Sequence, residues 1–255
     1  MEEKITVTKK DIVEGLKSLG IKNGDSVLVH SSLSKFGYVE GGIDAVIDAL
    51  LSTVGKEGTI LVPTLTGNKD LCAKNPPVFD PVNTPCWTGK IPETFRKRKE
   101  AVRSLHPTHS VSAIGKLADY FVKGHEDSLT PCGKNSPYWK LAEKGGYILF
   151  LGVSINCCTF LHSIEEIAKA PYHLQKEIVK AKIIVDGKEI YRELYIHAYG
   201  TAMEFARILP VLEKNNALRR GKIGNSDILL VKAKNIADFI LPIIENDKLF
   251  LVKAK

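Results

Sequence analysis

The chain has 255 residues, of which 44% are hydrophobic and 25% charged, and a formal net charge of +7. This composition is ordinary for a globular protein with a sizeable core. No stretch is apolar over the length of a membrane span, and the opening MEEKITVTKK lacks the apolar segment of a signal peptide. We therefore expect no membrane partner and a cytoplasmic location. The five cysteines are odd in number and lack zinc-site spacing, which predicts free thiols in a reducing compartment.

The positive charge does not by itself indicate a nucleic-acid partner. The densest basic run, FRKRKEAVR at residues 95–103, is typical of a solvated helix face. We find no zinc finger, no aromatic RNA-binding signature and no basic helix-turn-helix, so we expect no nucleic-acid partner. An anionic small molecule, such as a phosphorylated cofactor, explains the excess charge equally well.

The first third of the chain predicts a βαβ unit. A helix follows Thr8, which is a candidate cap. SVLVHSS then predicts a buried strand, GIDAVIDALLSTVG a helix and TILVPTLTG a second buried strand. This order of strand, helix and strand is typical of a parallel sheet.

The middle of the chain contains a long loop and the strongest single strand. Residues 67–90 are rich in proline and lack periodicity, which is typical of a binding loop or lid. A helix is expected near Pro92, and a strand interrupted at Pro107 follows it. Two further helices, in KLADYFVKGH and SPYWKLAEKGG, precede the apolar strand YILFLGV.

In the last third of the chain, apolar and polar residues alternate as they do in antiparallel strands. Asp186-Gly187 is the best hairpin turn in the sequence. Two helices, in FARILPVLEKNNAL and NIADFILPIIEND, enclose a strand pair in GKIGNSDILLVKA. We predict one α/β domain over residues 1–255, with a mixed, largely parallel central sheet flanked by helices and an antiparallel addition in the C-terminal third.

The segment TFLHSIEEIAKA, residues 159–170, poses the main functional question. It predicts one helix with an apolar stripe on one side and His162, Glu165, Glu166 and Lys169 on the other. That polar stripe is either a solvated surface or a base with an orienting carboxylate one turn on. The position after the carboxyl end of a strand is where α/β proteins place ligands, and free amides at a helix start favour an anion or oxyanion.

Three other constellations have both a structural and a chemical interpretation. VHSSLSKFG, residues 29–37, is either a capped strand-to-helix loop or a phosphate-holding loop. In RSLHPTHSV, residues 103–111, alternation places His106 and Ser110 on one side; the structural interpretation is one core histidine and one exposed histidine. Cys158 lies four residues before His162 and is either a buried small residue or a nucleophile.

These segments together resemble the aminoglycoside 3-N-acetyltransferase family. The resemblance runs from about Val27 to about Pro171, then more loosely through GKIGNSDILLVKAKNIADFI. It is carried, in this order, by VHSSLSKFG, TILVPTLTG, FDPVNTPCWTGKIPETFR, VRSLHPTHSVSAIG, PCGKNSPYWKL and LFLGVSINCCTFLHSIEE. It implies transfer of an acetyl group from acetyl-coenzyme A to an amine, on an α/β fold distinct from the common acetyltransferase superfamily.

The resemblance also implies roles for individual residues. His162 matches the active-site histidine, Glu165 the carboxylate after it and Thr159 the hydroxyl residue before it. The positions expected to meet coenzyme A are Ser31, Ser32, Leu33, Lys35, Phe36, Gly37, Arg103, His106, Ser110 and Val111. Among these, Lys35 and Arg103 are the candidate partners of its phosphates.

The expected acceptor is an aminoglycoside or a similar amine, and Asp80 and Glu166 are the acids expected to face it. Asn156 stands where several relatives carry an acid, which would weaken attraction for a polycationic sugar, as would the net charge. We expect acetyl-coenzyme A and a small-molecule amine as the partners and no metal, with a homodimer as a possible assembly.

Three alternatives stay open at this point. One is a zinc hydrolase in which His162-x-x-Glu165 is joined by His106 or His197. Another is a ping-pong transferase that acts through Cys158. The third is a non-catalytic binder of coenzyme A or an aminoglycoside.

Overall fold

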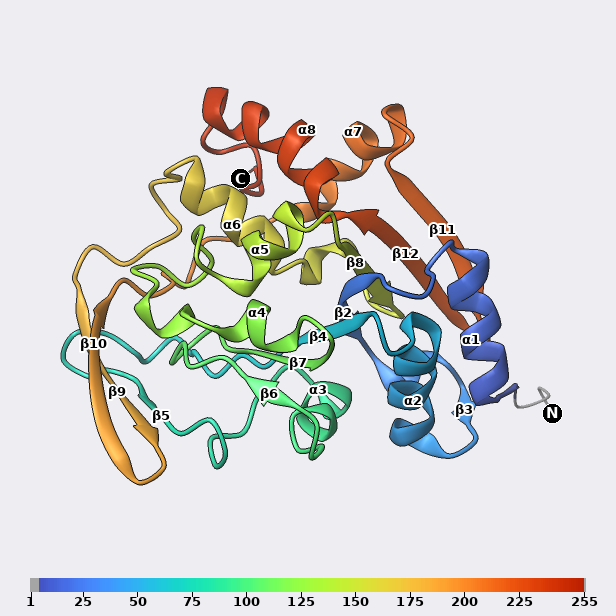
Figure 1. Ribbon diagram of the computed structural model, residues 1–255. Coiled ribbons are helices and arrows are strands. Elements are labelled where there is room, and N and C mark those ends of the chain that lie inside the picture. Colours follow the sequence, from blue (N-terminus) through green and yellow to red (C-terminus); the bar gives the residue numbers. More distant parts are fainter. Residues whose placement is uncertain (1–4, 255) are drawn as a thin grey trace.

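The computed structural model describes residues 5–254 and contains a central seven-stranded sheet (Figure 1). Its strand order is β11-β12-β8-β2-β4-β7-β6. The strands of this sheet are β2 (Ser26–Ser31), β4 (Thr59–Pro63), β6 (Val102–Arg103), β7 (Val111–Gly115), β8 (Tyr147–Leu151), β11 (Leu218–Ile223) and β12 (Ser226–Lys232).

The sheet is mixed, as predicted, but fewer of its strand pairings are parallel than predicted. Only the central strands β8, β2 and β4 pair in parallel, and the pairings outside them are antiparallel. The predicted βαβ unit is confirmed, because β2 and β4 are parallel neighbours joined through α2. The stretch around Pro107 is the loop of an antiparallel pair rather than a break in one strand.

Two smaller sheets lie beside the large one. Strand β1 (Thr6–Val7) pairs with β3 (Tyr38–Val39). Strands β9 (Val179–Val185) and β10 (Lys188–Leu194) form the predicted hairpin, and β5 (Val78–Phe79) pairs in parallel with β9. The turn residues Asp186 and Gly187 both have positive φ, at 51° and 74°, as a tight hairpin turn requires.

Helices cover both faces of the central sheet. They are α1 (Lys9–Ser18), α2 (Gly42–Val54), α3 (Lys90–Phe95), α4 (Ala118–Val122), α5 (Pro137–Glu143), α6 (Phe160–Ile167), α7 (Leu209–Lys214) and α8 (Ala233–Asn246). Side chains alternate across β2, so Val27 and Val29 pack with α1, α2 and α3, while Leu28 packs with α5, α6 and α8. The α/β class is confirmed. No helix among residues 5–254 is long and apolar enough to cross a membrane.

Two predicted helices are shorter than expected. Helix α3 ends at Phe95, so the basic run after it is not a helix face; Arg98 instead bonds to Asp44 at 2.7 Å and Asp48 at 2.5 Å on α2. Helix α6 ends at Ile167, because Lys169 turns the chain with φ of 57°. The predicted cap at Thr8 is confirmed by a capping box with Asp11.

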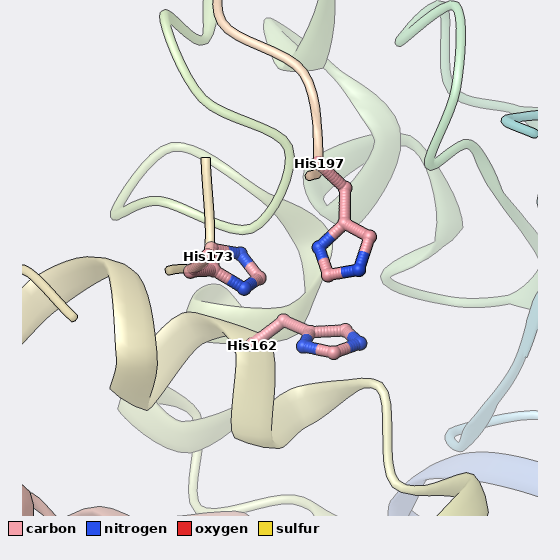
Figure 2. A group of neighbouring side chains, drawn as sticks. All are labelled: His162, His173 and His197. Carbon is pink, nitrogen blue, oxygen red and sulfur yellow. The ribbon is translucent and has the colours of Figure 1, made fainter. Parts of the chain in front are cut away.

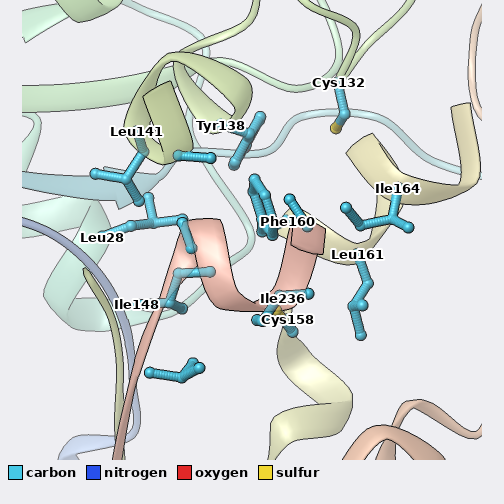
Figure 3. Packing of buried hydrophobic residues seen from close by; sticks show 14 of the residues in the cluster. Leu28, Cys132, Tyr138, Leu141, Ile148, Cys158, Phe160, Leu161, Ile164 and Ile236 are labelled. Atoms are coloured by element: carbon cyan, nitrogen blue, oxygen red, sulfur yellow. The ribbon is translucent and has the colours of Figure 1, made fainter. Parts of the chain in front are cut away.

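Helix α6 is held in a large apolar cluster. Figure 3 shows Phe160, Leu161 and Ile164 of this helix among Tyr138 of α5 and Ile236 of α8. All five side chains are fully buried. Burying side chains of this size is worth about 1.5–3 kcal/mol each, which fixes the rotation of α6 about its axis and so the direction of its polar side.

Gly115 offers a test of the pairing between β4 and β7. Its φ is 132°, and an added Cβ would lie 2.2 Å from the carbonyl oxygen of Gly58. We expect Gly115→Ala to lower the free energy of unfolding by more than about 2 kcal/mol, measured by chemical denaturation. Gly124→Ala is the control, because φ there is 77° but no atom of the described residues lies within 4 Å of an added Cβ; it should lower the free energy of unfolding by about 1 kcal/mol. Equal losses in the free energy of unfolding for the two variants would contradict the close approach of Gly115 to Gly58.

Candidate active site

The polar side of α6 is not a solvated surface. Glu165 has no exposed area, the side chain of Glu166 is 3% exposed and that of His162 is 17% exposed. The apolar side of the helix packs into the core, so the polar side faces other parts of the protein. The interpretation of this segment as a solvated surface is therefore wrong, and the base with an orienting carboxylate stays a prediction.

His162 and Glu165 form a close pair. The Nδ1 atom of His162 lies 2.6 Å from Oε2 of Glu165, one helical turn away. Burial alone would raise the pKa of Glu165, but hydrogen bonds and charge from His162 and His173 outweigh it and hold this pKa well below its usual range. The carboxylate therefore stays ionised and accepts the Nδ1 hydrogen, which leaves the lone pair of Nε2 available.

His173 is a second histidine beside the same carboxylate, and no periodic pattern in the sequence pointed to it. Its Nδ1 lies 3.1 Å from Glu165 Oε2, and its Nε2 lies 3.2 Å from Glu166 Oε1. Burial would lower the pKa of His173, but these two carboxylates outweigh it and raise the pKa to about 9. His173 is therefore a buried imidazolium beside His162, with ring centroids 4.9 Å apart (Figure 2).

The third ring in Figure 2 belongs to His197, which the bridge between Leu174 and His197 brings beside His173. Ring nitrogens of His162, His173 and His197 lie within 4.8 Å of one another, which is close enough for a metal site. A metal ligand, however, needs a free lone pair: Nε2 of His173 bonds Glu166 Oε1 at 3.2 Å, and its Nδ1 lies 3.1 Å from Glu165 Oε2. Among residues 5–254 this cluster contains His197 but not His106, so the zinc alternative with His106 has no support in the structure.

His162 opens onto a cavity of about 350 Å³ that we call the histidine hollow. Its lining comes from the ends of β2, β4 and β8, the loop before α6, the long loop and the segment after β10. The lining residues are Val29, His30, Ser31, Pro63, Leu65, Trp87, Thr88, Pro92, Val153, Asn156, Cys157, Cys158, Thr159, His162 and Phe205. Thr159 makes no cap hydrogen bond with its side chain, so its hydroxyl is available to a ligand.

A second cavity of about 650 Å³, which we call the serine hollow, adjoins the first. Ser31, Trp87 and Thr88 line both. The remaining lining residues of the serine hollow are Ser32, Leu33, Ser34, Gly37, Tyr38, Val39, Gly42, Gly89, Lys90 and Ile91. The predicted cofactor positions Ser31, Ser32, Leu33 and Gly37 are thus brought together with His162 and Thr159.

Two other residues of the loop after β2 lie elsewhere. Phe36 has no exposed area and packs in the core with α1 and α2, so its ring is not available to a cofactor. Lys35 lines a third cavity beside Arg220, separate from the serine hollow. These two positions are corrections to the predicted cofactor contacts.

Arg103 is also a correction, because its guanidinium is used inside the protein. It donates to the carbonyl oxygens of Pro81 at 3.0 Å, Thr84 at 2.6 Å and Thr64 at 3.0 Å, and to Ser110 Oγ at 3.0 Å. Burial lowers its pKa to about 10. Arg103 therefore ties the long loop to β4, and its donors are committed to the protein rather than to a phosphate.

The remaining predicted cofactor residues are sealed from solvent. Ser110 donates to the carbonyl oxygen of Thr64 at 2.7 Å, and Val111 begins β7 with no exposed area. The Nδ1 atom of His106 accepts the backbone N–H of His109 at 3.1 Å. Both histidines of this segment are buried, against the interpretation that one is exposed. The side chains of this second segment do not reach either hollow.

The two acids expected to face the acceptor do not do so. Asp80 accepts the backbone N–H groups of Val82 and Asn83 at 2.8 and 2.9 Å and caps a turn. Glu166 accepts the backbone N–H of Cys132 at 2.8 Å and pairs with His173. Both predictions are corrected, because these carboxylates are committed to holding the fold.

Sequence reasoning missed His30, Trp87 and Phe205 as lining residues of the histidine hollow. The Nε2 atom of His30 and Oγ of Ser31 are buried, and neither has a hydrogen-bond partner among residues 5–254. Buried polar groups are normally satisfied, so these atoms are suited to a ligand. The signal available in the sequence was the position of His30 and Ser31 at the carboxyl end of a parallel strand.

Substitution of Arg103 tests its structural role. Arg103→Lys removes the fork that bonds several carbonyls, and we expect it to lower the free energy of unfolding by about 2–4 kcal/mol in chemical denaturation. Arg207→Lys is the control, since Arg207 makes a partly exposed pair with Glu204 worth less than about 1 kcal/mol. A stable Arg103→Lys protein with a raised KM for acetyl-coenzyme A would contradict this structural role and support the predicted contact of Arg103 with a phosphate.

The raised pKa of His173 makes stability depend on pH. Its contribution is fully present below pH 6.5 and is lost as pH rises from 6.5 through about 9. The stability advantage of the native protein over His173→Gln should therefore shrink by on the order of 3 kcal/mol across that window, measured by denaturation at each pH.

His30→Gln is the matched control for that experiment. Burial lowers the pKa of His30 to about 3, so its effect on stability changes only as pH falls below 6.5. If the curves for the native protein and His173→Gln stayed parallel between pH 6.5 and 9, His173 would not be a buried cation.

Comparisons with known proteins show the family to which the chain is similar. A family model described as aminoglycoside 3-N-acetyltransferase matches residues 28–245. Aminoglycoside N(3)-acetyltransferase VII of Streptomyces paromomycinus is 31% identical over 91% of this chain and 90% of its own.

Solved structures extend the likeness to the fold. The structure of AAC-IIIb with coenzyme A has a TM-score of 0.82 and 28% identity over 95% of this chain and 97% of that one. The complex of a histidine-to-alanine variant of aminoglycoside acetyltransferase AAC(3)-IVa with a gentamicin has a TM-score of 0.85 and 26% identity, covering 100% of this chain and 94% of that one. The chain belongs to the aminoglycoside 3-N-acetyltransferase family of acyltransferases.

Proposed function

We propose that the protein transfers the acetyl group of acetyl-coenzyme A directly to an amine, with His162 as general base and Glu165 as its orienting carboxylate. The observation that carries the proposal is the 2.6 Å contact of His162 Nδ1 with Glu165. This contact leaves Nε2 of His162 free to accept a proton, and the His162 side chain lines the histidine hollow. Family membership supports the reaction class.

The reaction requires a neutral amine, because an ammonium ion has no lone pair. The amine nitrogen attacks the thioester carbonyl carbon, the C–N bond forms and the C–S bond breaks. His162 Nε2 takes a proton from the nitrogen, and the coenzyme A sulfur leaves as a thiolate that is protonated to the thiol. Glu165 stabilises the positive charge that His162 acquires in this step.

Thr159 and the start of α6 suit the charge that develops on the acyl group. The Thr159 hydroxyl lies three residues before His162 and lines the same cavity. A hydroxyl and a helix N-terminus both stabilise a developing oxyanion or a leaving thiolate. We assign Thr159 this role in the proposal.

The serine hollow is the better site for the body of coenzyme A. It is larger than the histidine hollow, and Lys90 is its only charged lining residue among the part of the chain that the structure describes. A lysine and loop amides are suited to phosphates. The thioester would then reach the histidine hollow past Ser31, Trp87 and Thr88, which line both cavities. The AAC-IIIb complex with coenzyme A supports this cofactor for the fold.

The ping-pong alternative has little physical support. Burial raises the pKa of the Cys158 thiol to about 12, and the side chain has no exposed area. A thiol with so little thiolate is a poor nucleophile. Direct transfer needs neither a covalent intermediate nor a metal ion.

A cytoplasmic location and a homodimer remain proposals of ours.

Three substitutions test the mechanism. His162→Ala should lower kcat/KM by about 10²–10⁴-fold, because it removes the base. Glu165→Gln should lower it less, because the imidazole remains but loses its orienting charge. Cys158→Ala should keep most of the native rate. The measurement is release of free thiol from acetyl-coenzyme A with an amine present, on proteins whose folding is checked by circular dichroism.

Two outcomes would overturn this mechanism. A folded His162→Ala protein with the native rate would show that His162 is not the general base. Loss of activity in a folded Cys158→Ala protein, together with an acetylated native enzyme, would restore the ping-pong pathway.

A further inference from the structure

We propose that the acceptor carries a single amine on a neutral, partly apolar or aromatic body, and that a polycationic sugar is a poor substrate. This inference rests on the function proposed above. It concerns the histidine hollow, where the acceptor nitrogen must meet His162.

The first argument is the charge of the cavity wall. Among the described residues that line the histidine hollow, none is Asp, Glu, Lys or Arg. His30, the other histidine in this lining, does not add charge, since burial lowers its pKa to about 3. A ligand with several ammonium groups would lose hydration in this cavity and gain no opposite charge in return.

The second argument is the charge of the cluster behind the wall. Glu165 and Glu166 are two anions, and His173 is one cation between them at 3.1 and 3.2 Å. With His162 neutral, the three groups carry a formal net charge of −1. One negative charge balances one ammonium group. The carboxylates themselves are buried and bonded, so they cannot turn outward to meet further ammonium groups.

The third argument is the shape and apolar character of the cavity. Its volume of about 350 Å³ lies near the lower end of ~300–1,000 Å³ for ligand pockets, and it must also admit the thioester. Phe205 stands edge-on to His162, with ring centroids 5.4 Å apart. Trp87 is 60% exposed at the junction of the two hollows, and its Nε1–H donates to the carbonyl oxygen of Gly67 at 2.8 Å. These two rings are suited to a flat apolar body attached to the amine.

Asn156 is the position at which this preference can be changed. It is exposed, lines the histidine hollow and accepts the backbone N–H of Ala206 through Oδ1 at 2.9 Å. An aspartate has the same shape and can keep that bond with one oxygen. Its second oxygen would add the negative charge that the wall lacks.

The experiment measures kcat/KM from free-thiol release with 2-phenylethylamine, which has one ammonium group, and with gentamicin, which has several. We expect the native protein to prefer 2-phenylethylamine by at least about tenfold, or 1.4 kcal/mol. Asn156→Asp should raise kcat/KM for gentamicin by about fivefold at low salt, and added salt should reduce that gain.

Asn23→Asp is the matched control. It adds the same charge at an exposed position before β2, outside both hollows, and should leave the ratio of the two substrates unchanged. Native turnover of gentamicin that equals or exceeds that of 2-phenylethylamine would overturn this inference while leaving the acetyl transfer intact. An equal gain for both substrates in Asn156→Asp would overturn it too. No thiol release with either amine would overturn the proposed function, and this inference with it.

Discussion

The site depends on one buried electrostatic arrangement, in which Glu165 is shared by His162 and His173. An ionised carboxylate with no exposed area is costly unless it is paired and hydrogen-bonded. His173 provides the compensating charge, and Glu166 bonds its other nitrogen. The arrangement keeps Glu165 charged, which sets the tautomer of His162 and directs the free nitrogen of the ring at a cavity.

The rest of the fold serves to hold that arrangement in place. The apolar side of α6 is buried among α5 and α8, so the helix cannot rotate its polar side to solvent. The chain then turns at Lys169 and returns His173 over the helix, where a bridge from Leu174 to His197 fixes it. The parallel strands β8 and β2 end beside each other, which brings His30 and Ser31 to the same cavity.

The lysines and arginines that make the chain basic do not line the histidine hollow among the described residues. The prominent arginines are used for structure: Arg98 ties α2 to the segment after α3, and Arg103 ties the long loop to β4. The acids nearest His162 are likewise committed to internal partners. What remains for ligands is a neutral wall with aromatic side chains, beside a larger hollow with one lysine. The fold is that of the family, and the described lining of the histidine hollow contains no acidic side chain.

Local pattern in the sequence predicted several of the elements and, as one of two interpretations, the pairing of His162 with Glu165. Apolar runs and helical spacing predicted the βαβ unit, the hairpin of β9 and β10, and α6, because those signals depend on neighbours along the chain. The spacing of three residues between His162 and Glu165 put them on one helix face, and the resemblance assigned their roles. Only the tertiary structure decided the direction of the other polar groups. His173 joined the dyad, whereas Arg103, Asp80 and Glu166 turned inward to satisfy backbone groups. A buried carbonyl or amide must find a partner, and which side chain supplies it depends on segments far apart in the sequence that only folding brings together.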